Sequence, residues 1–303
     1  MSAQKEKTCI ILAGPTAVGK TAVGIELARH FNTSIISADS RQCFREMNIG
    51  VARPSLQELA AVPHYFVASH SIKEEITAAS FEAYALNAAA TIFREHDVAV
   101  MVGGTGLYIK AFAEGMDNIP PIPASIRSEV QAGYDANGLS WLQTQLQEKD
   151  PVWFSGGEIQ NPQRMMRALE VVLSTGESIR QYQQANPRPR PFRIIPIALE
   201  LPRPVLYERI NQRVLAMMEN GLLDEVKSLL PYRSLNALQT VGYKELFDYL
   251  DGRCSLDEAV SLVQQNTRHY AKRQLTWFRK QPATTWFSPL DYSQLIKHLD
   301  KLV

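Results

Sequence analysis

The 303-residue sequence predicts an α/β fold in which helices flank a parallel sheet and an all-helical domain is inserted into the core. Three observations lead to this prediction. Short β-rich runs alternate with helical patterns, a glycine-rich loop follows the first run, and two proline-rich segments bracket a stretch of purely helical patterns. We therefore expect a core made of residues 1–116 and 191–303, interrupted by a helical insertion at 117–190.

The strands of the core are predicted from apolar runs in the first third of the chain. These runs are "CIILA", "SIISA" and "VAVMV", each short and bounded by Gly, Asp or Ser. Helical patterns separate them, and in "TAVGIELARHF" the residues Val23, Leu27 and Phe31 recur with the spacing of one helix face. Alternation of strand and helix is typical of βαβ units, so the sheet is expected to be parallel.

The insertion is predicted to start at the proline-rich "DNIPPIPAS" and to contain three helical segments. The third segment has clear ends, because Asn161 is a natural N-cap, Pro162 suits the first helical position and Gly176 suits the end. A second proline-rich segment, Asn186 to Arg193, leads back to the β-rich run "IIPIALEL". The rest of the chain reads as helices.

Composition limits the possible partners and compartments. The chain has 32 basic and 31 acidic side chains, so a nucleic-acid surface would have to arise from local clustering. Three separated cysteines with no CxxC pair fit a reducing compartment and offer no recognisable zinc site. No run approaches the roughly 20 apolar residues of a membrane span. We expect a cytoplasmic protein that needs no membrane and no obligate protein partner, and that acts as a monomer.

A phosphate-binding loop is the most specific motif. Gly14-x4-Gly19-Lys20-Thr21 matches the P-loop pattern, between a predicted strand and a predicted helix, which makes the core P-loop NTPase-like. Lys20 is expected to reach the outer phosphate, and the Thr21 hydroxyl to bind Mg²⁺. Backbone N–H groups of the whole loop are expected to cradle the phosphates. The loop consists of Gly14, Pro15, Thr16, Ala17, Val18, Gly19, Lys20 and Thr21.

The run "VAVMV" lacks the acid that usually provides a second metal ligand in P-loop NTPases. It ends in "GGTGLY", where Gly103, Gly104 and Gly106 permit close backbone approach and Thr105 offers a hydroxyl. This departure argues against an ordinary ATP hydrolase or motor.

An acid does follow the run "SIISA". Asp39 comes at its end, where the crevice of an α/β sheet opens. Its carboxylate could bind Mg²⁺ or accept a proton from an acceptor group, and the competing interpretation is a turn or N-cap aspartate. Ser40, Arg41 and Gln42 follow as a polar set suited to reading a base.

Basic residues gather in two regions and allow two interpretations. The C-terminal "HYAKRQLTWFRK" mixes cations with Tyr270, Trp277 and Phe278, which suits either RNA contact or packing on the core. Arg209 and Arg213 share one helix face and could stabilise phosphate charge or pair with acids at the surface. The basic residues of the insertion and its exit could form an RNA footprint or a solvated face: Arg164, Arg167, Arg180, Arg188, Arg190 and Arg193.

Seven stretches in order, "GPTAVGKT", "SADSRQ", "GGTGLYI", "RALEV…TG", "NGLLDEV", "VGYKE" and "AKRQLTWFR", resemble those of the tRNA dimethylallyltransferases, also called tRNA isopentenyltransferases. The resemblance extends over nearly the whole chain. It implies transfer of the dimethylallyl group of dimethylallyl diphosphate to N6 of the adenosine 3′-adjacent to the anticodon, with Mg²⁺ as cofactor and tRNA, gripped at its anticodon stem-loop, as partner.

The resemblance also implies roles for individual residues. Residues 14–21 would hold the diphosphate, Asp39 would be the catalytic base, and Arg213, or Arg209 on the same face, would stabilise the departing diphosphate. Ser40, Arg41 and Gln42 would contact the target base, together with Asp39. Further tRNA contacts are implied at Thr105, Arg127, Gln163, Arg164, Met165, Met166, Arg167, Gly242, Tyr243 and Lys244.

Two other functions fit parts of the sequence. A P-loop kinase would use ATP as donor and Asp39 as the base for a hydroxyl acceptor, but it has no need of the basic helices. A non-catalytic RNA-binding module would leave the complete P-loop unexplained.

Overall fold

The computed structural model describes residues 6–183 and 187–303. The chain divides into two compact units, one made of Met1–Gly115 and Pro189–Val303 and the other of Met116–Arg188. Each unit has its own hydrophobic core. Asn186, the first residue of the second predicted proline-rich segment, lies outside the described residues.

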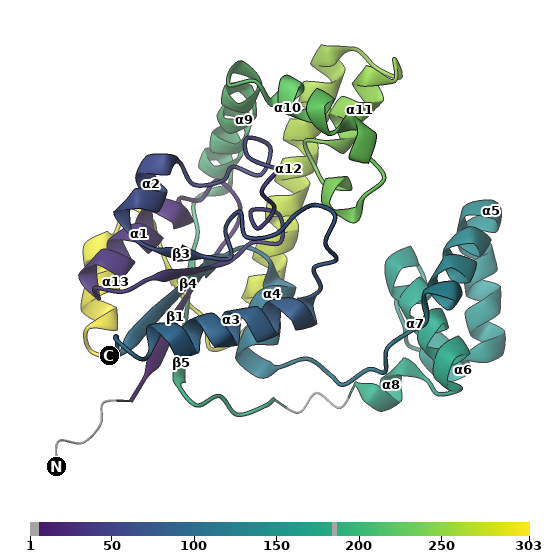
Figure 1. The fold of residues 1–303 in the computed structure, drawn as a ribbon, viewed down its shortest axis with the longest axis horizontal. Coiled ribbons are helices and arrows are strands. Elements are labelled where there is room, and N and C mark those ends of the chain that lie inside the picture. The colour runs from purple at the N-terminus through teal and green to yellow at the C-terminus, as the bar shows by residue number, and fades with distance from the viewer. Residues whose placement is uncertain (1–5, 184–186) are drawn as a thin grey trace. The chain divides into compact units, whose positions relative to one another are not determined.

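The larger unit is built on a six-stranded sheet with the order β3-β2-β4-β1-β5-β6 (Figure 1). Every neighbouring pair is parallel, which confirms the predicted α/β class. The edge strands β3 and β6 were not predicted, because neither has an apolar run of its own. The strands are β1 Thr8–Ala13, β2 Ile35–Ala38, β3 His64–Tyr65, β4 Val98–Gly103, β5 Arg193–Leu199 and β6 Thr285–Phe287.

Helices cover this sheet and extend beyond one end of it (Figure 1). The main core joins β1, β4 and β5 to residues of α1, α9, α12 and α13. The P-loop lies between β1 and α1, and α9 to α12 gather beyond the sheet on the same side (Figure 1). The helices are α1 Lys20–His30, α2 Leu56–Ala61, α3 Ala78–Ile92, α4 Gly106–Glu114, α9 Arg203–Glu219, α10 Leu222–Leu229, α11 Lys244–Leu250, α12 Leu256–Arg279 and α13 Tyr292–Leu299, with short 3-10 turns at Leu230–Tyr232 and Asn236–Leu238.

In the described residues of the smaller unit, all regular secondary structure is helical. It contains α5 Ala124–Lys149, α6 Pro151–Phe154, α7 Pro162–Thr175 and α8 Ile179–Tyr182. Gly138 interrupts α5 with φ 71° and ψ −162°, which separates the two helices predicted there. The predicted ends of α7 are present, since the Asn161 side chain accepts from Arg164 N and Gly176 adopts φ 76°.

Within residues 6–183 and 187–303, none of the helices combines the length and apolar character required to span a bilayer.

Candidate active site

The P-loop has the backbone conformation that its sequence predicts. Gly14 and Gly19 have φ of 146° and 108°, and a Cβ on Gly14 would lie 2.8 Å from the carbonyl oxygen of Leu199. Ala17 also takes a left-handed conformation, with φ 64°. The side chain of Val18 is fully buried in the main core and anchors the loop. The backbone therefore wraps tightly at the point where β1 passes into α1.

Lys20 folds back onto this loop. Its Nζ donates to the carbonyl oxygens of Gly14, at 2.9 Å, and Pro15, at 2.7 Å. Burial lowers the pKa of Lys20 to about 7, an effect that Asp39 opposes and Arg213 reinforces. At neutral pH the Lys20 side chain is therefore partly deprotonated. Binding of an anion beside it would favour the protonated form.

Two cavities adjoin the P-loop. The first, of 390 Å³, is lined by polar and charged groups that include Thr16, Lys20, Thr21, Asp39, Arg209 and Arg213. The second, of 220 Å³, is lined by Asp39, Ser40, Arg41, Gly50, Val51 and Gly242, and by several apolar side chains of α9 and α12. Five residues border both cavities: Thr16, Asp39, Val51, Arg213 and Tyr270. After the roles that the sequence predicts for their residues, we call them the diphosphate cavity and the acceptor cavity, respectively.

Asp39 lies between the two cavities. It follows the end of β2, and its Oδ1 accepts from the backbone N–H groups of Arg41 at 2.9 Å and Gln42 at 3.1 Å. One carboxylate oxygen therefore makes the turn that the competing interpretation expected. The same side chain lines both cavities. The turn therefore does not exclude a chemical role for Asp39, because it holds the carboxylate at the cavities.

The polar residues after Asp39 have distinct positions. Ser40 and Arg41 line the acceptor cavity, and Thr105 Oγ1 accepts from Ser40 N at 3.1 Å. Gln42 borders the diphosphate cavity, and its Nε2 donates to the carbonyl oxygens of Val51 and Ala52 at 3.2 and 3.0 Å. The Nε2 group of Gln42 thus holds a cavity wall, and its predicted role as a base reader stays a prediction.

The glycines at the end of β4 permit the close approach predicted for them. A Cβ on Gly103 would lie 2.2 Å from the carbonyl oxygen of Ala38, and one on Gly104 equally close to Gln274 Nε2. Thr105 N donates to that same Ala38 oxygen at 3.1 Å. The segment that replaces the usual acid of P-loop NTPases therefore packs directly on the end of β2.

Arg209 and Arg213 both reach the P-loop from α9. Arg213 is partly buried, borders both cavities and donates through Nη1 to Thr16 Oγ1 at 3.3 Å. Burial lowers the pKa of Arg213, and Asp39 raises it. Arg209 is exposed, borders only the diphosphate cavity and donates to Val18 O at 3.4 Å. The geometry favours phosphate-directed arginines over the surface ion-pairing interpretation.

Gln274 of α12 is a site residue that sequence reasoning missed. Its Oε1 accepts from Thr16 N at 2.8 Å, and its Nε2 donates to Gly104 O at 2.9 Å. The side chain is buried and links the P-loop to the segment after β4. A glutamine within a basic stretch gives no local signal of this contact.

Two aromatic residues of the same helix pack on the core. Phe278 is buried and a Cβ on Gly106 would lie 2.2 Å from Trp277, which supports the packing interpretation for these two aromatics.

Tyr270 of α12 differs from these two aromatic residues, because it borders both cavities. Burial raises the pKa of Tyr270 to about 12, and Asp39 contributes in the same direction. Its phenol therefore stays protonated at neutral pH.

Three of the predicted tRNA contacts need correction. Tyr243 and Met165 are fully buried and Met166 is 5% exposed, so their side chains have no surface for direct RNA contact. The two methionines belong to the core of the helical unit, and the Tyr243 hydroxyl donates to Glu225 Oε1 at 2.6 Å. The N–H group of buried Gly242 donates to Glu245 Oε2 at 2.8 Å.

The exposed members of the predicted tRNA set lie on helices. Gln163, Arg164 and Lys244 are exposed, and Arg127 lies in the first turn of α5. The Arg164 guanidinium pairs with Glu158, and Arg167 lies 3.4 Å from Glu170.

Arg190 shows that part of the predicted basic footprint is structural. Its guanidinium donates to Glu82 Oε1 at 2.7 Å and to the carbonyl oxygens of Phe112 and Ala111 at 2.8 Å. Only 9% of its side chain is exposed. Arg193 donates to Leu302 O and Arg180 to Trp153 O. These three arginines hold parts of the fold together, a role that neither the RNA-footprint nor the solvated-face interpretation anticipated.

In residues 6–183 and 187–303, no cluster of three or more His, Cys, Asp or Glu side chains could hold a metal by itself. Thr21 and Asp39 both line the diphosphate cavity, as does Glu58.

Comparison with known proteins decides the family. A model described as IPP transferase matches residues 42–281. The chain belongs to the IPP transferase family. A tRNA dimethylallyltransferase of Christiangramia forsetii is 46% identical over 92% of each chain, and one of Cytophaga hutchinsonii is 42% identical over 97% of each.

Solved structures agree with this assignment. The tRNA isopentenylpyrophosphate transferase of Bacillus halodurans is 36% identical, with a TM-score of 0.71 that covers 98% of this chain and 95% of that one. A eukaryotic dimethylallyltransferase described as acting on tRNA is 27% identical, with a TM-score of 0.71 over 89% of this chain and 69% of that one. The resemblance and the fold class predicted from the sequence are confirmed, and the kinase alternative finds no support.

Proposed function

We propose that this IPP transferase moves the dimethylallyl group of dimethylallyl diphosphate to N6 of the adenosine 3′-adjacent to the anticodon of tRNA and releases diphosphate. The names of the relatives support the reaction class. The observation that carries the proposal in this chain is the pair of cavities that meet at Asp39, one beside the P-loop and two arginines, the other beside Ser40 and Arg41.

The chemistry follows from what each cavity offers. An adenine amine is a weak nucleophile, so the allylic C–O bond must break as the new C–N bond forms, and negative charge collects on the diphosphate. Backbone N–H groups of the P-loop, Lys20 and Arg213 face that charge, and each such donor contributes about 3 kcal/mol in comparable sites. Asp39 accepts the proton that N6 loses. Diphosphate leaves as an anion and is not a phosphoryl donor.

We propose Mg²⁺ as the cofactor, and the donor set fits it. Magnesium is typically held by one or two protein oxygens and by substrate phosphates, with waters completing the octahedron. The Thr21 hydroxyl and the Asp39 carboxylate, which line the same cavity, are suitable oxygen donors. When bound, Mg²⁺ would neutralise part of the diphosphate charge.

We also propose that the helical unit grips the anticodon stem-loop through its exposed residues, with Arg127, Gln163, Arg164 and Arg167 as contacts. Phosphate contacts of this kind position the RNA, while groups in the acceptor cavity select the base. The target adenosine must leave its stack to enter that cavity. We also propose that the protein acts as a monomer in the cytoplasm, where tRNA is available.

The test is direct. Purified protein incubated with unmodified tRNA, Mg²⁺ and dimethylallyl diphosphate should yield a prenylated adenosine, detected by nucleoside mass spectrometry. The matched control is the same tRNA with another base in place of the adenosine after the anticodon, which should stay unmodified. Phosphate transfer from ATP without prenylation would contradict the proposal.

A further inference from the structure

The carboxylate of Glu225, on α10, collects four hydrogen-bond donors. Its Oε2 accepts from the backbone N–H groups of Asn48 at 3.0 Å and Ile49 at 2.7 Å. Its Oε1 accepts from Gly50 N at 3.0 Å and from the Tyr243 hydroxyl at 2.6 Å. The reaction proposed above assigns no role to this residue, which lies outside both cavities.

The loop that Glu225 holds continues directly into a cavity wall. Gly50, Val51 and Ala52 line the acceptor cavity opposite α9. A Cβ on Gly50 would lie 2.7 Å from the Tyr243 ring, so the loop packs tightly against that buried side chain. Gln42 holds the carbonyl groups of Val51 and Ala52 from the other side. The wall is therefore held on both sides, by Glu225 and Tyr243 on one side and by Gln42 on the other.

We propose that Glu225 is a positioning residue that fixes the wall Gly50–Ala52 of the acceptor cavity and thereby controls the binding of the target nucleoside. It acts through three backbone N–H groups and Tyr243, and it touches no substrate. The inference rests on the proposed function for the identity of the nucleoside, while the loop geometry is independent of it.

A carboxylate suits this position because all four partners are donors. Burial, together with the nearby carboxylate, raises the pKa of Tyr243 and keeps its hydroxyl protonated. Glutamine has nearly the same shape but replaces one acceptor oxygen with an NH₂ group, which would face donors. Glu225→Gln therefore removes part of the clamp without emptying the space it fills.

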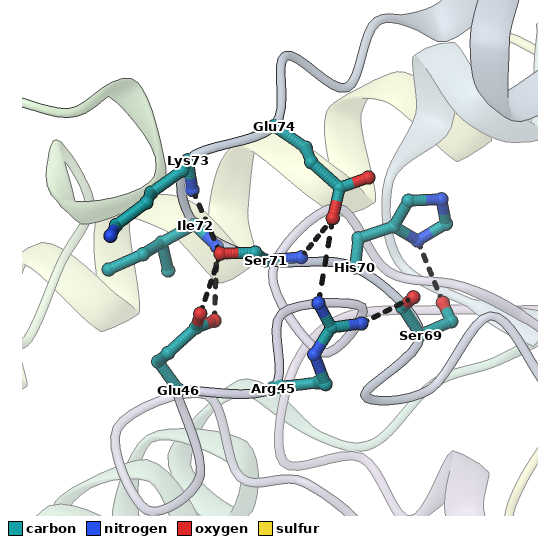
Figure 2. Close-up of polar contacts among 8 residues, drawn as sticks. All are labelled: Arg45, Glu46, Ser69, His70, Ser71, Ile72, Lys73 and Glu74. Carbon is teal, nitrogen blue, oxygen red and sulfur yellow. Dashed lines mark hydrogen bonds and ion pairs between the residues drawn. The ribbon is translucent and has the colours of Figure 1, made fainter.

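Glu46 provides a matched control on the same loop. Its carboxylate accepts from Ser71 Oγ at 2.6 Å and from Ile72 N at 3.0 Å, as Figure 2 shows. An ion pair between Arg45 Nη2 and Glu74 Oε1, 3.7 Å apart, joins the same two loops. Glu46, Ser71 and Ile72 border neither cavity. Glu46→Gln is thus the same chemical change at a carboxylate that also holds a loop, but a loop segment that borders neither cavity.

The first measurement is hydrogen exchange of the unliganded protein. Glu225→Gln should speed exchange of the amides of Asn48, Ile49 and Gly50 by up to about tenfold, since the acceptor loses its charge and the amides that face the new NH₂ group lose their bond. Glu46→Gln should speed exchange at Ile72 and leave residues 48–50 unchanged. Unchanged exchange at 48–50 in Glu225→Gln would overturn the proposal, whether or not the protein prenylates tRNA.

The second measurement separates positioning from general damage. In steady-state prenylation, Glu225→Gln should raise KM for tRNA about tenfold while KM for dimethylallyl diphosphate and kcat change less than about twofold. Glu46→Gln should match the unaltered protein. Equal changes in both Michaelis constants, or a loss confined to kcat, would overturn the proposal.

Tyr243→Phe keeps the ring and removes a single donor, so it tests the same clamp if Glu225→Gln does not fold. It should raise KM for tRNA by about threefold with kcat unchanged, and no rise would overturn the proposal. An unaltered protein that fails to prenylate tRNA would instead overturn the proposed function and leave the exchange result standing.

Discussion

The two walls of the site are built in opposite ways. One wall is a single stretch, Thr16 to Ala22, which runs from the loop after β1 into the first turn of α1. The facing wall is assembled from the segment after β2, from α9, from residues 240–242 and from α12. The first wall is a local motif, whereas the second exists only because four distant segments pack together.

The difference extends to their charges. Lys20, the cation of the P-loop wall, has a pKa lowered to about 7 by burial, so its charge is conditional at neutral pH. Arg213 and Arg209 reach the same cavity from α9 and, as guanidinium groups, stay charged at neutral pH. The comparison teaches that the local motif shapes the proposed anion site, while the assembled wall provides the permanent charge and the proposed base.

The largest expected effect tests the assembled wall at Asp39. Asp39→Ala should lower kcat for prenylation by about 10³-fold, because the proton acceptor is lost, while tRNA affinity stays within about threefold. Asp39→Asn, which keeps the shape and can still accept from the turn N–H groups, should be equally slow. Filter binding checks affinity. If affinity falls together with activity in both variants, Asp39 positions the RNA and is not the base.

A smaller effect separates the two arginines of α9. Arg213→Ala should lower kcat by about 10²-fold, because this guanidinium borders both cavities and faces the departing charge. Arg209→Ala should lower it by about tenfold or less, because its exposed charge is screened by water. Single-turnover rates at saturating substrate measure both variants. The reverse order would assign the diphosphate role to Arg209.

The smallest effect concerns the conditional charge of Lys20. Because its pKa is lowered from 10.5 to about 7, the free protein should take up a proton when diphosphate binds above pH 7. Affinity for inorganic diphosphate, compared with that of Lys20→Met, should fall by up to about tenfold per pH unit from pH 7 upward. Calorimetry in buffers of different ionisation enthalpy measures the proton uptake.

The same shift has a consequence for stability, with a definite sign. Between pH 7 and 10.5 the unfolded chain keeps the Lys20 proton and the folded chain releases it. The unfolded state therefore binds more protons, and Lys20 makes the folded state relatively more stable as pH rises through this range. Chemical denaturation of the unliganded protein should show that the free energy of unfolding rises with pH between pH 7 and 10.5. Lys20→Met should lack this contribution.

Much of the fold could be predicted because its signals are local. The strands β1, β2 and β4 and the caps of α7 each depend on a few neighbouring residues, and they are present. The edge strands β3 and β6 could not be predicted, since two or three residues acquire strand geometry only by pairing with a neighbour. The structural role of Arg190 could not be predicted for a related reason, because its pairing with Glu82 joins residues far apart in the chain.

By itself the sequence determined the parallel α/β class, the P-loop and the carboxylate that follows β2, because hydrophobic period, glycine conformation and residue type are properties of short segments. Only the tertiary structure decided that Arg213, Tyr270 and Gln274 meet that loop, that Gln42 holds a wall and that Glu225 clamps it. These contacts join segments separated by more than a hundred residues or depend on the direction of one side chain. Such proximity is set by packing, and no local pattern encodes it.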